Sequence, residues 1–280
     1  MRNKSALKLL LSDQDIVRCF DSAIHNAVKI NTVRCNYRRY NKTGLLKHPY
    51  MIRAGRNYKT PWTRDASINT WQAMNFIDPE VSRTTLLAVC DTDANFQPVI
   101  QPDVQTWDQI VWAIGAYNYY LTTGDEEFLT IAYGVICRAL STHRKNRFNE
   151  KYGLFVGGSF FNDGIAGYPL SCHQDGNNDS FAPAHPVVET IMCLSTNCLY
   201  CEASAFSVRF PVILDWQTKP KLPIYTTMRS KLQSTHYSGA KSLTVTDISF
   251  IPTAQQTTLR SSAATLLLCY SASAPKKDAT

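Results

Sequence analysis

Apolar residues recur at helical spacing near the start of the chain. Between Asp15 and about Val33 they fall on one face, which predicts an amphipathic helix with Ser12 or Asp13 available as its cap. The members of this face are Ile16, Phe20, Ala23, Ile24, Ala27 and Val28. One helix is therefore expected ahead of the first long polar stretch.

The same spacing returns in later segments. A helix start is indicated at Asp78-Pro79-Glu80, because proline is favoured in the first turn. Residues 107–121 are apolar almost all round, which indicates a helix buried on most sides, and Gly124 marks its end. The predicted helices cover about residues 64–74, 79–89, 107–121, 126–140 and 187–203, and period-two strand patterns are rare. The fold class is therefore mainly α.

Two stretches without a sustained period separate these helices. Residues 36–60 are polar, basic and aromatic, and residues 153–169 are rich in glycine and aromatic side chains. Loops of this length in a compact domain often carry function. Helical hairpins that alternate with long polar loops on one side are typical of an α/α barrel.

The character of the chain changes at about residue 205. Glutamate is absent after Glu202, while Ser, Thr and Lys become common and no helical face persists. We divide the chain into residues 1–204 and a divergent basic tail, 205–280. The tail is interpreted either as a divergent loop-rich appendage or small β module, or as the product of a reading-frame shift or gene truncation. Reading the underlying DNA in its other frames separates these alternatives.

Charge and hydropathy exclude some partners. Residues 217–280 contain eight Lys and Arg against two acids and so hold most of the net charge of +7, which leaves the helical part nearly neutral. We therefore expect no nucleic-acid partner. No apolar run approaches the roughly 20 residues that span a bilayer, so no membrane partner is expected. The apolar start is interrupted at Ser12, so no signal peptide is predicted and the chain as given would be cytoplasmic.

Cysteine and histidine spacings do not indicate a cofactor. The nine cysteines are an odd number, and Cys198-Leu-Tyr-Cys201 lies in an apolar run without a second pair. His173, His185, Asp175 and Asp179 lie among Gly, Asn, Ser and Pro, which we interpret as a flexible loop. We therefore predict no metal ion and no cofactor.

Several residues carry chemistry that suits a sugar. Arg64-Asp65 at a helix start can bind neighbouring hydroxyls, although an ion pair or a helix cap is the alternative. Trp62 and Trp107 lie beside polar turns and are candidate stacking surfaces, whereas Trp71 and Trp112 are expected in the core.

Asp163 is the candidate acid. It lies among aromatic residues and before a glycine, where partial desolvation could raise its pKa enough for it to donate a proton. The alternative is an Asp-Gly turn, which is the commoner use of that dipeptide.

Three segments in this order and spacing resemble the six-hairpin glycosidase superfamily, which includes glucoamylases, trehalases and processing α-glucosidases. They are Trp62-Thr-Arg-Asp-Ala66, the stretch from Trp107-Asp-Gln to Leu129, and Asn162-Asp-Gly-Ile-Ala-Gly-Tyr168. The similarity covers roughly residues 15–203. It implies the N-terminal half of an (α/α)6 toroid and an oligosaccharide substrate.

The resemblance also implies site residues. It assigns substrate contacts to Trp62, Arg64 and Asp65, to which we add Trp107 and Asp108, and it assigns the acid to Asp163. It further implies an inverting reaction whose base comes from later hairpins, and this sequence departs from the superfamily there.

A whole barrel needs about twelve helices, or on the order of 350 residues, so truncation could leave the chain inactive. The alternatives are a sugar epimerase or lyase on the same toroid, or a sugar-binding remnant without turnover. The oligomeric state stays open.

Overall fold

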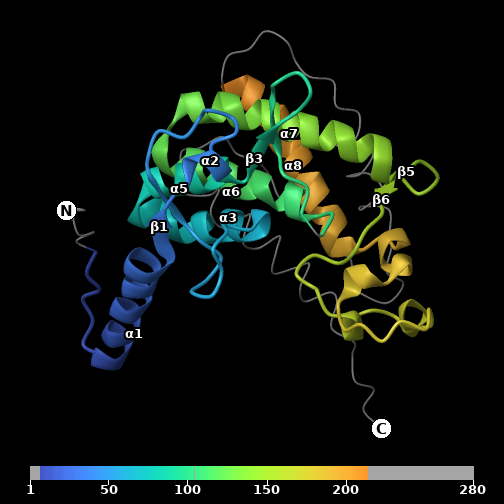
Figure 1. Cartoon of the computed structure of the whole chain (residues 1–280), viewed down its shortest axis with the longest axis horizontal. Coiled ribbons are helices and arrows are strands. Elements are labelled where there is room, and N and C mark those ends of the chain that lie inside the picture. The colour runs from blue at the N-terminus through green and yellow to red at the C-terminus, as the bar shows by residue number, and fades with distance from the viewer. Residues whose placement is uncertain (1–6, 104, 214–280) are drawn as a thin grey trace, which may run out of the picture. The chain divides into compact units, whose positions relative to one another are not determined.

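The computed structural model describes residues 7–103 and 105–213, which are mainly helical (Figure 1). The chain divides into two compact units. Of the described residues, those from 7 to 146 and from 202 to 213 form the first unit, and Arg147–Cys201 form the second. The mainly α fold class predicted from the hydrophobic pattern is confirmed.

The N-terminal helix begins where its cap was expected. Asp13 accepts hydrogen bonds from the backbone N–H groups of Asp15 and Ile16, and α1 follows over Gln14–His25. A π-helical turn, Asn26–Asn31, continues it before strand β1, Thr32–Arg34. The helical region therefore ends earlier than the predicted end near Val33, because the chain enters strand β1 at Thr32.

Helices α3, α5 and α6 pack against one another in the first unit. Helix α3, Thr63–Asn69, lies beside α6, Asp108–Thr123, and both contact α5, Pro79–Ala88 (Figure 1). The Asp78 side chain accepts the N–H of Val81, so the predicted start of α5 is confirmed. Short pieces complete this region: α2 over Tyr37–Tyr40, a π-helical turn over Thr70–Met74, and α4 over Asn75–Ile77.

Helix α6 forms the core of this unit, as the sequence predicted. Eleven consecutive or nearly consecutive residues from Asp108 to Tyr119 are buried. The Trp112 indole is fully buried and donates to the carbonyl of Leu86 at 2.9 Å. Gly124 ends α6 with a φ of +67°, a left-handed conformation that glycine adopts without strain. The helix is thus bounded by local signals and stabilised by burial.

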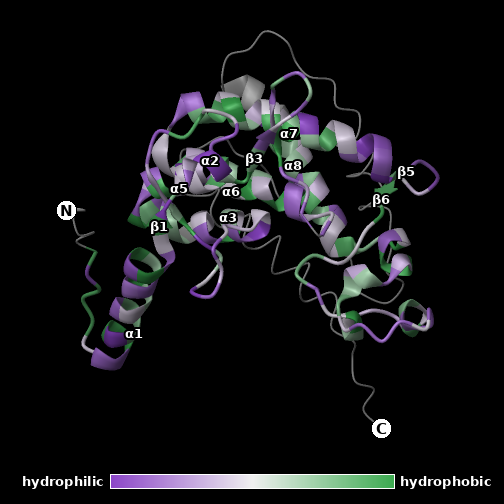
Figure 2. Cartoon of the chain, viewed as in Figure 1, coloured by the Kyte–Doolittle hydropathy of each residue, from purple (hydrophilic) through white to green (hydrophobic). Residues whose placement is uncertain are grey.

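Helix α7, Glu126–Arg147, packs one face against α6, and apolar and polar residues alternate along it (Figure 2). Phe128 contacts the rings of Tyr119 and Trp112, with centroids 4.7 and 6.3 Å apart. Further along, a ring nitrogen of His143 lies 2.7 Å from the amide oxygen of Gln109. The buried face consists of Phe128, Leu129, Ala132, Val135, Ile136, Leu140 and His143, which is helical spacing.

Within the described residues, the strands form three two-stranded antiparallel sheets that the sequence did not predict. Strand β1 pairs with β2, Tyr50–Ile52; β3, Cys90–Thr92, with β4, Pro98–Ile100; and β5, Phe148–Asn149, with β6, Leu154–Phe155. Strands of two or three residues are too short for an alternating pattern to be read.

The second unit consists largely of short 3-10 turns. These cover Ile165–Gly167, Leu170–His173, Ala182–Ala184 and Pro186–Thr190. A small apolar cluster of Tyr168, Cys172, Ala182 and Val188 lies among them. The helix expected from about residue 187 therefore begins later, as α8 at Leu194, because the preceding segment forms a proline-initiated 3-10 turn.

Helix α8, Leu194–Ile213, continues past the boundary that we placed after residue 204. The predicted change of character thus falls inside a helix, and the rest of the predicted tail, residues 214–280, lies outside the described residues. None of the helices seen in residues 7–103 and 105–213 has both the length and the apolar character needed to cross a bilayer.

Candidate functional site

Arg64 is held by two residues at the start of α6. It is the second residue of α3, which begins directly after Trp62. Its Nε lies 3.1 Å from Oδ1 of Asp108, and its Cζ lies 4.9 Å from the centroid of the Trp107 ring. A guanidinium pairs with a carboxylate and stacks on an aromatic face in fixed directions. The orientation of Arg64 is therefore set by α6.

The two residues that hold Arg64 are fully buried. Trp107 and Asp108 are both 0% exposed, whereas the Arg64 side chain is 20% exposed. The second carboxylate oxygen of Asp108 accepts the backbone N–H of Gln105 at 2.9 Å. In the structure Trp107 and Asp108 thus contact Arg64, whereas the sequence led us to expect side chains that contact a sugar directly.

The more exposed candidate residues, Trp62, Arg64 and Asp65, lie at the beginning of α3 and are called the Arg64 group. Trp62 is 41% exposed, and Asp65 is half-buried beside Arg64. The first N–H of the helix, from Thr63, donates to the Asp103 carboxylate at 3.1 Å. Trp62, Arg64 and Asp65 therefore combine an indole, a guanidinium and a carboxylate next to solvent, which is a set of groups that suits a hydroxyl-rich ligand.

A close contact between α3 and α6 keeps this group together. The Ser67 hydroxyl donates to the Val111 carbonyl at 2.6 Å and accepts the N–H of Gly115 at 3.1 Å. A Cβ on Gly115 would lie 2.8 Å from the Ser67 Cα, closer than two such atoms can approach. The two helices therefore meet through the glycine, and this contact fixes the distance between Arg64 and Asp108.

Asp163 lies in the second unit, and its backbone is fixed on both sides. The Asp163 carbonyl accepts the N–H of Ala182 at 2.7 Å. The preceding carbonyl, of Asn162, accepts the Tyr168 hydroxyl at 3.0 Å, and that hydroxyl accepts the N–H of Ser159 at 2.8 Å. Burial raises the pKa of Tyr168 to about 12, so the phenol stays protonated and keeps donating. The half-buried Asp163 side chain thus extends from a backbone whose neighbouring carbonyls are both hydrogen-bonded.

Phe161, two residues before Asp163, has an unusual backbone. Its φ is +62°, in the left-handed region that costs a bulky residue on the order of 1 kcal/mol. Its ring is 50% exposed and its centroid lies 4.1 Å from that of Phe160. Strained backbone of this kind often accompanies function, and sequence patterns do not reveal it.

Glu202 in α8 is a carboxylate that our sequence reasoning did not consider as a candidate. Desolvation raises its pKa, and the nearby Arg209 opposes this shift. One carboxylate oxygen lies 3.8 Å from Nη1 of Arg209, and both side chains are about one-third exposed. Raised carboxyl pKa values are found at acid sites as well as in structural pairs. Residues seven positions apart lie on the same face of a helix, two turns from each other, so this spacing could have indicated the pair.

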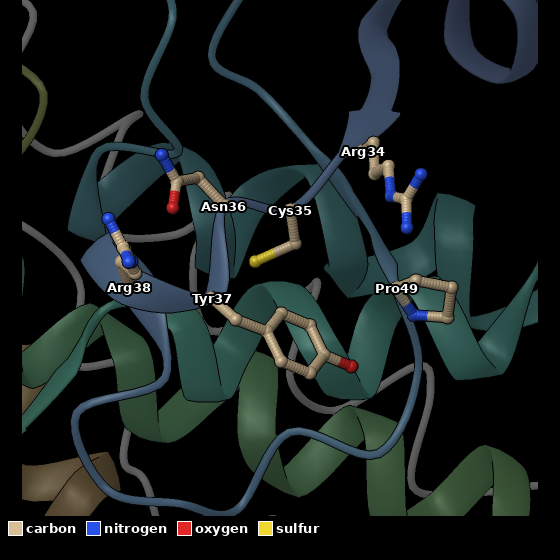
Figure 3. Close-up of a pocket in the computed structure, with 6 residues that line it drawn as sticks. All are labelled: Arg34, Cys35, Asn36, Tyr37, Arg38 and Pro49. Carbon is tan, nitrogen blue, oxygen red and sulfur yellow. The ribbon is translucent and has the colours of Figure 1, made fainter.

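A separate surface pocket of about 580 Å³ lies in the first unit at the start of the long polar stretch (Figure 3). It is lined by Arg34, Cys35, Asn36, Tyr37, Arg38 and Pro49. Burial raises the pKa of the Cys35 thiol to about 11, so the nucleophilic thiolate is scarce near neutral pH. None of the residues predicted for sugar binding lines this pocket.

The structure brings Arg64 into contact with Trp107 and Asp108, whereas Trp62 and Asp65 are its neighbours in the chain. All five residues belong to the first unit, and Asp163 belongs to the second. Within residues 7–103 and 105–213, no three His, Cys, Asp or Glu side chains are grouped as metal ligands. Comparisons with protein-family models, with curated proteins and with solved structures find no match.

Proposed function

We propose that the chain binds an oligosaccharide at the start of α3 and descends from glycosidases built of six helical hairpins. The orientation of Arg64 carries this proposal: its guanidinium is fixed by Asp108 and Trp107, yet it keeps access to solvent. A donor group that is held rigidly before the ligand arrives loses little entropy on binding.

Each group has a separate part in this proposal. Arg64 and Asp65 bind neighbouring sugar hydroxyls, one as a donor and the other as an acceptor. Trp62, which is 41% exposed, provides an apolar face for the sugar ring. Trp107 and Asp108 orient Arg64 from beneath. The antiparallel neighbours α6 and α7, joined by the Gly124 turn, are the hairpin unit from which we infer a partial (α/α)6 toroid.

The reaction that we propose is inverting hydrolysis with Asp163 as the acid. The Asp163 carboxyl protonates the leaving glycosidic oxygen while a second carboxylate activates water on the opposite face of the sugar. The backbone anchors on both sides of Asp163 support this role, because an acid must be placed within hydrogen-bond reach of its substrate.

Sugar binding without turnover is the second candidate. It is favoured by the absence of glutamate from the sequence after Glu202, where the superfamily resemblance would place the second carboxylate. Retained affinity for the sugar without release of reducing ends would identify such a binding protein.

The binding experiment compares Arg64→Lys with a matched variant. Removing the cation would leave the buried Asp108 charge uncompensated, so lysine is the safer substitution. Lysine keeps the charge but loses the planar set of donors, and we expect sugar affinity to fall roughly 10- to 100-fold. The control is Arg83→Lys, because Arg83 makes a similar pair, with Nε 3.0 Å from the Asp125 carboxylate and Cζ 5.9 Å from the Phe128 ring centroid.

The probes are α- and β-linked gluco- and manno-oligosaccharides, titrated by calorimetry into the full chain. Equal losses of affinity in both variants would indicate a general effect on folding and would contradict the proposed binding site. Absence of binding to every probe by the folded wild-type chain would reject an oligosaccharide ligand of this class.

Hydrolysis is tested with the same oligosaccharides by measuring reducing ends. We expect Asp163→Asn, which keeps the shape of the side chain but cannot supply an acidic proton, to lower the rate at least 100-fold. Unchanged hydrolysis in this variant would remove Asp163 from the reaction. Binding without hydrolysis by the wild-type chain would favour the second candidate.

A further inference from the structure

The segment that carries Asp163 closes on itself through its backbone. The N–H of Ala182 donates to the Asp163 carbonyl at 2.7 Å, and the N–H of Ile165 donates to the Ser180 carbonyl at 2.9 Å. Gly164 and Phe181 form an antiparallel bridge between these two bonds. The position of Asp163 therefore depends on where residues 180–182 are held.

His185 holds that side of the segment through both of its ring nitrogens. Nδ1 lies 2.9 Å from Oδ2 of Asp175, and Nε2 lies 2.8 Å from the carbonyl oxygen of Asp179. The side chain is 1% exposed, which leaves almost no room for water to replace either partner. Carboxylate and carbonyl oxygens only accept hydrogen bonds, so both nitrogens must carry a proton. The geometry thus requires an imidazolium, although the sequence indicated a flexible loop.

The two partners of His185 also organise the backbone between them. The other oxygen of Asp175 accepts the N–H of Asn177 at 3.0 Å, and the carboxylate of Asp179 accepts the N–H of Phe181 at 2.9 Å. Phe181 directly precedes Ala182, which binds Asp163. A chain of hydrogen bonds therefore connects the imidazolium with the backbone of the candidate acid.

We propose that His185, as an imidazolium, is a positioning residue: its two hydrogen bonds, to Asp175 and to the Asp179 carbonyl, hold the segment that carries Asp163 in place. This pair of hydrogen bonds is called the lock, and it opens when the imidazolium loses its proton. The part that concerns catalysis rests on the proposed function, because it matters only if Asp163 is the acid. A neutral ring has one donor and one acceptor, so it would face one of its two oxygens with a lone pair.

The electrostatics give the pH range of the lock. The hydrogen bond to the Asp179 carbonyl, and then the Asp175 carboxylate, raise the pKa of His185 above its ordinary value. The Asn177 N–H, and then His185, lower the pKa of the Asp175 carboxyl. The charged groups that act on the ring are the carboxylates of Asp175 and Asp179. The lock is therefore closed between the lowered pKa of Asp175 and the raised pKa of His185, and it opens as the pH rises through the latter.

The protonation state is measured first, by nitrogen-15 NMR of the imidazole rings in the full chain between pH 5 and 9. We expect both nitrogens of His185 to be protonated at neutral pH and to titrate above the ordinary range of a histidine, because both of their partners are oxygen acceptors. In Asp175→Asn the midpoint of His185 should fall, because the amide keeps an acceptor but not the charge. A neutral His185 at pH 6, or a midpoint unchanged in Asp175→Asn, would overturn the proposal.

The opening of the lock is measured by amide hydrogen exchange, expressed as protection factors so that the intrinsic pH dependence is removed. We expect protection of the Ile165 and Ala182 amides to fall as His185 titrates. In His185→Gln it should be lower by roughly tenfold or more at every pH, because the neutral amide replaces both charged donors of the imidazolium. The control is His173→Gln, in which a ring nitrogen 3.2 Å from the Tyr168 carbonyl is replaced in the same segment. Equal effects of the two substitutions would refute the specific role of His185.

The pH profile of reducing-end release separates this inference from the proposed function. If His185 positions Asp163, the alkaline limb of the profile moves to lower pH in Asp175→Asn, as the NMR midpoint does. Exchange that follows His185 while Asp163→Asn stays active would support the lock and reject Asp163 as the acid. If amide protection does not change as His185 titrates, while Asp163→Asn is inactive, the lock alone is rejected.

Discussion

Replacing Gly115 by alanine tests the contact that positions the Arg64 group. The new Cβ would lie 2.6 Å from the Ser67 Oγ and 2.8 Å from the Ser67 Cα. The second of these atoms is backbone, so α3 and α6 must move apart. This movement would also weaken the hydrogen bond from the Gly115 N–H to the Ser67 hydroxyl, now 3.1 Å long.

The sign of the effect follows from two destabilising contributions and one stabilising contribution. Overpacking of a core costs about 1–3 kcal/mol, and weakening of a buried hydrogen bond adds about 1 kcal/mol. Alanine in place of glycine inside a helix recovers about 1 kcal/mol. We therefore expect Gly115→Ala to lower the free energy of unfolding by about 1–3 kcal/mol.

Gly134→Ala in α7 is the matched control. Its Cβ would lie 3.2 Å from the terminal nitrogens of Arg138, which need to shift by only a few tenths of an ångström while the Arg138 Nε keeps donating to the Pro98 carbonyl. Only the gain in helix propensity then remains, so this variant should be more stable by about 0.5–1 kcal/mol. Urea unfolding followed by circular dichroism measures both values, and calorimetry measures sugar affinity, which should fall only in Gly115→Ala.

The reasoning fails if Gly115→Ala is as stable as the wild type while Gly134→Ala gains stability as expected. That result would mean that α3 and α6 do not approach through the glycine. A destabilised Gly115→Ala with unchanged sugar affinity would instead separate the helix contact from the proposed binding site.

Two further predictions concern backbone strain and thiol chemistry. Phe161 and Phe96 have φ values of +62° and +59°, a region that asparagine tolerates, so Phe161→Asn and the control Phe96→Asn should each raise the free energy of unfolding in urea by up to about 1 kcal/mol. Only Phe161→Asn should slow hydrolysis. Equal effects of the two substitutions on the rate of hydrolysis would exclude Phe161 from the site. Burial raises the pKa of Cys35 to about 11, so Cys35 should react with iodoacetamide at pH 8 at least tenfold more slowly than the exposed Cys19. Peptide mass spectrometry measures both labelling rates, and fast labelling of Cys35 would contradict its burial.

Elements with strong local signals could be predicted from the sequence. The start of α5 at Asp78 and Pro79, the burial of α6 and the turn at Gly124 each depend on residues that are close in the chain. Trp112 was expected in the core for the same reason, since its helix is apolar on nearly all sides.

Features that depend on distant partners could not be predicted in this way. Nothing near Trp107 in the chain shows that Arg64, more than forty positions earlier, covers its ring and leaves it fully buried. The strands are too short for a period to be detected, and their pairing depends on the helices around them.

The sequence by itself determined the helical class, the position of the main helices and the residue types available for sugar chemistry, because periodicity and capping act over a few residues. Only the tertiary structure decided which of those residues reach solvent and which hold others in place. In the structure Asp108 pairs with Arg64, and both ring nitrogens of His185 contact oxygens of the loop that the sequence predicted to be flexible. The physical reason is that burial and hydrogen-bond pairing are set by neighbours in space, which local patterns do not specify.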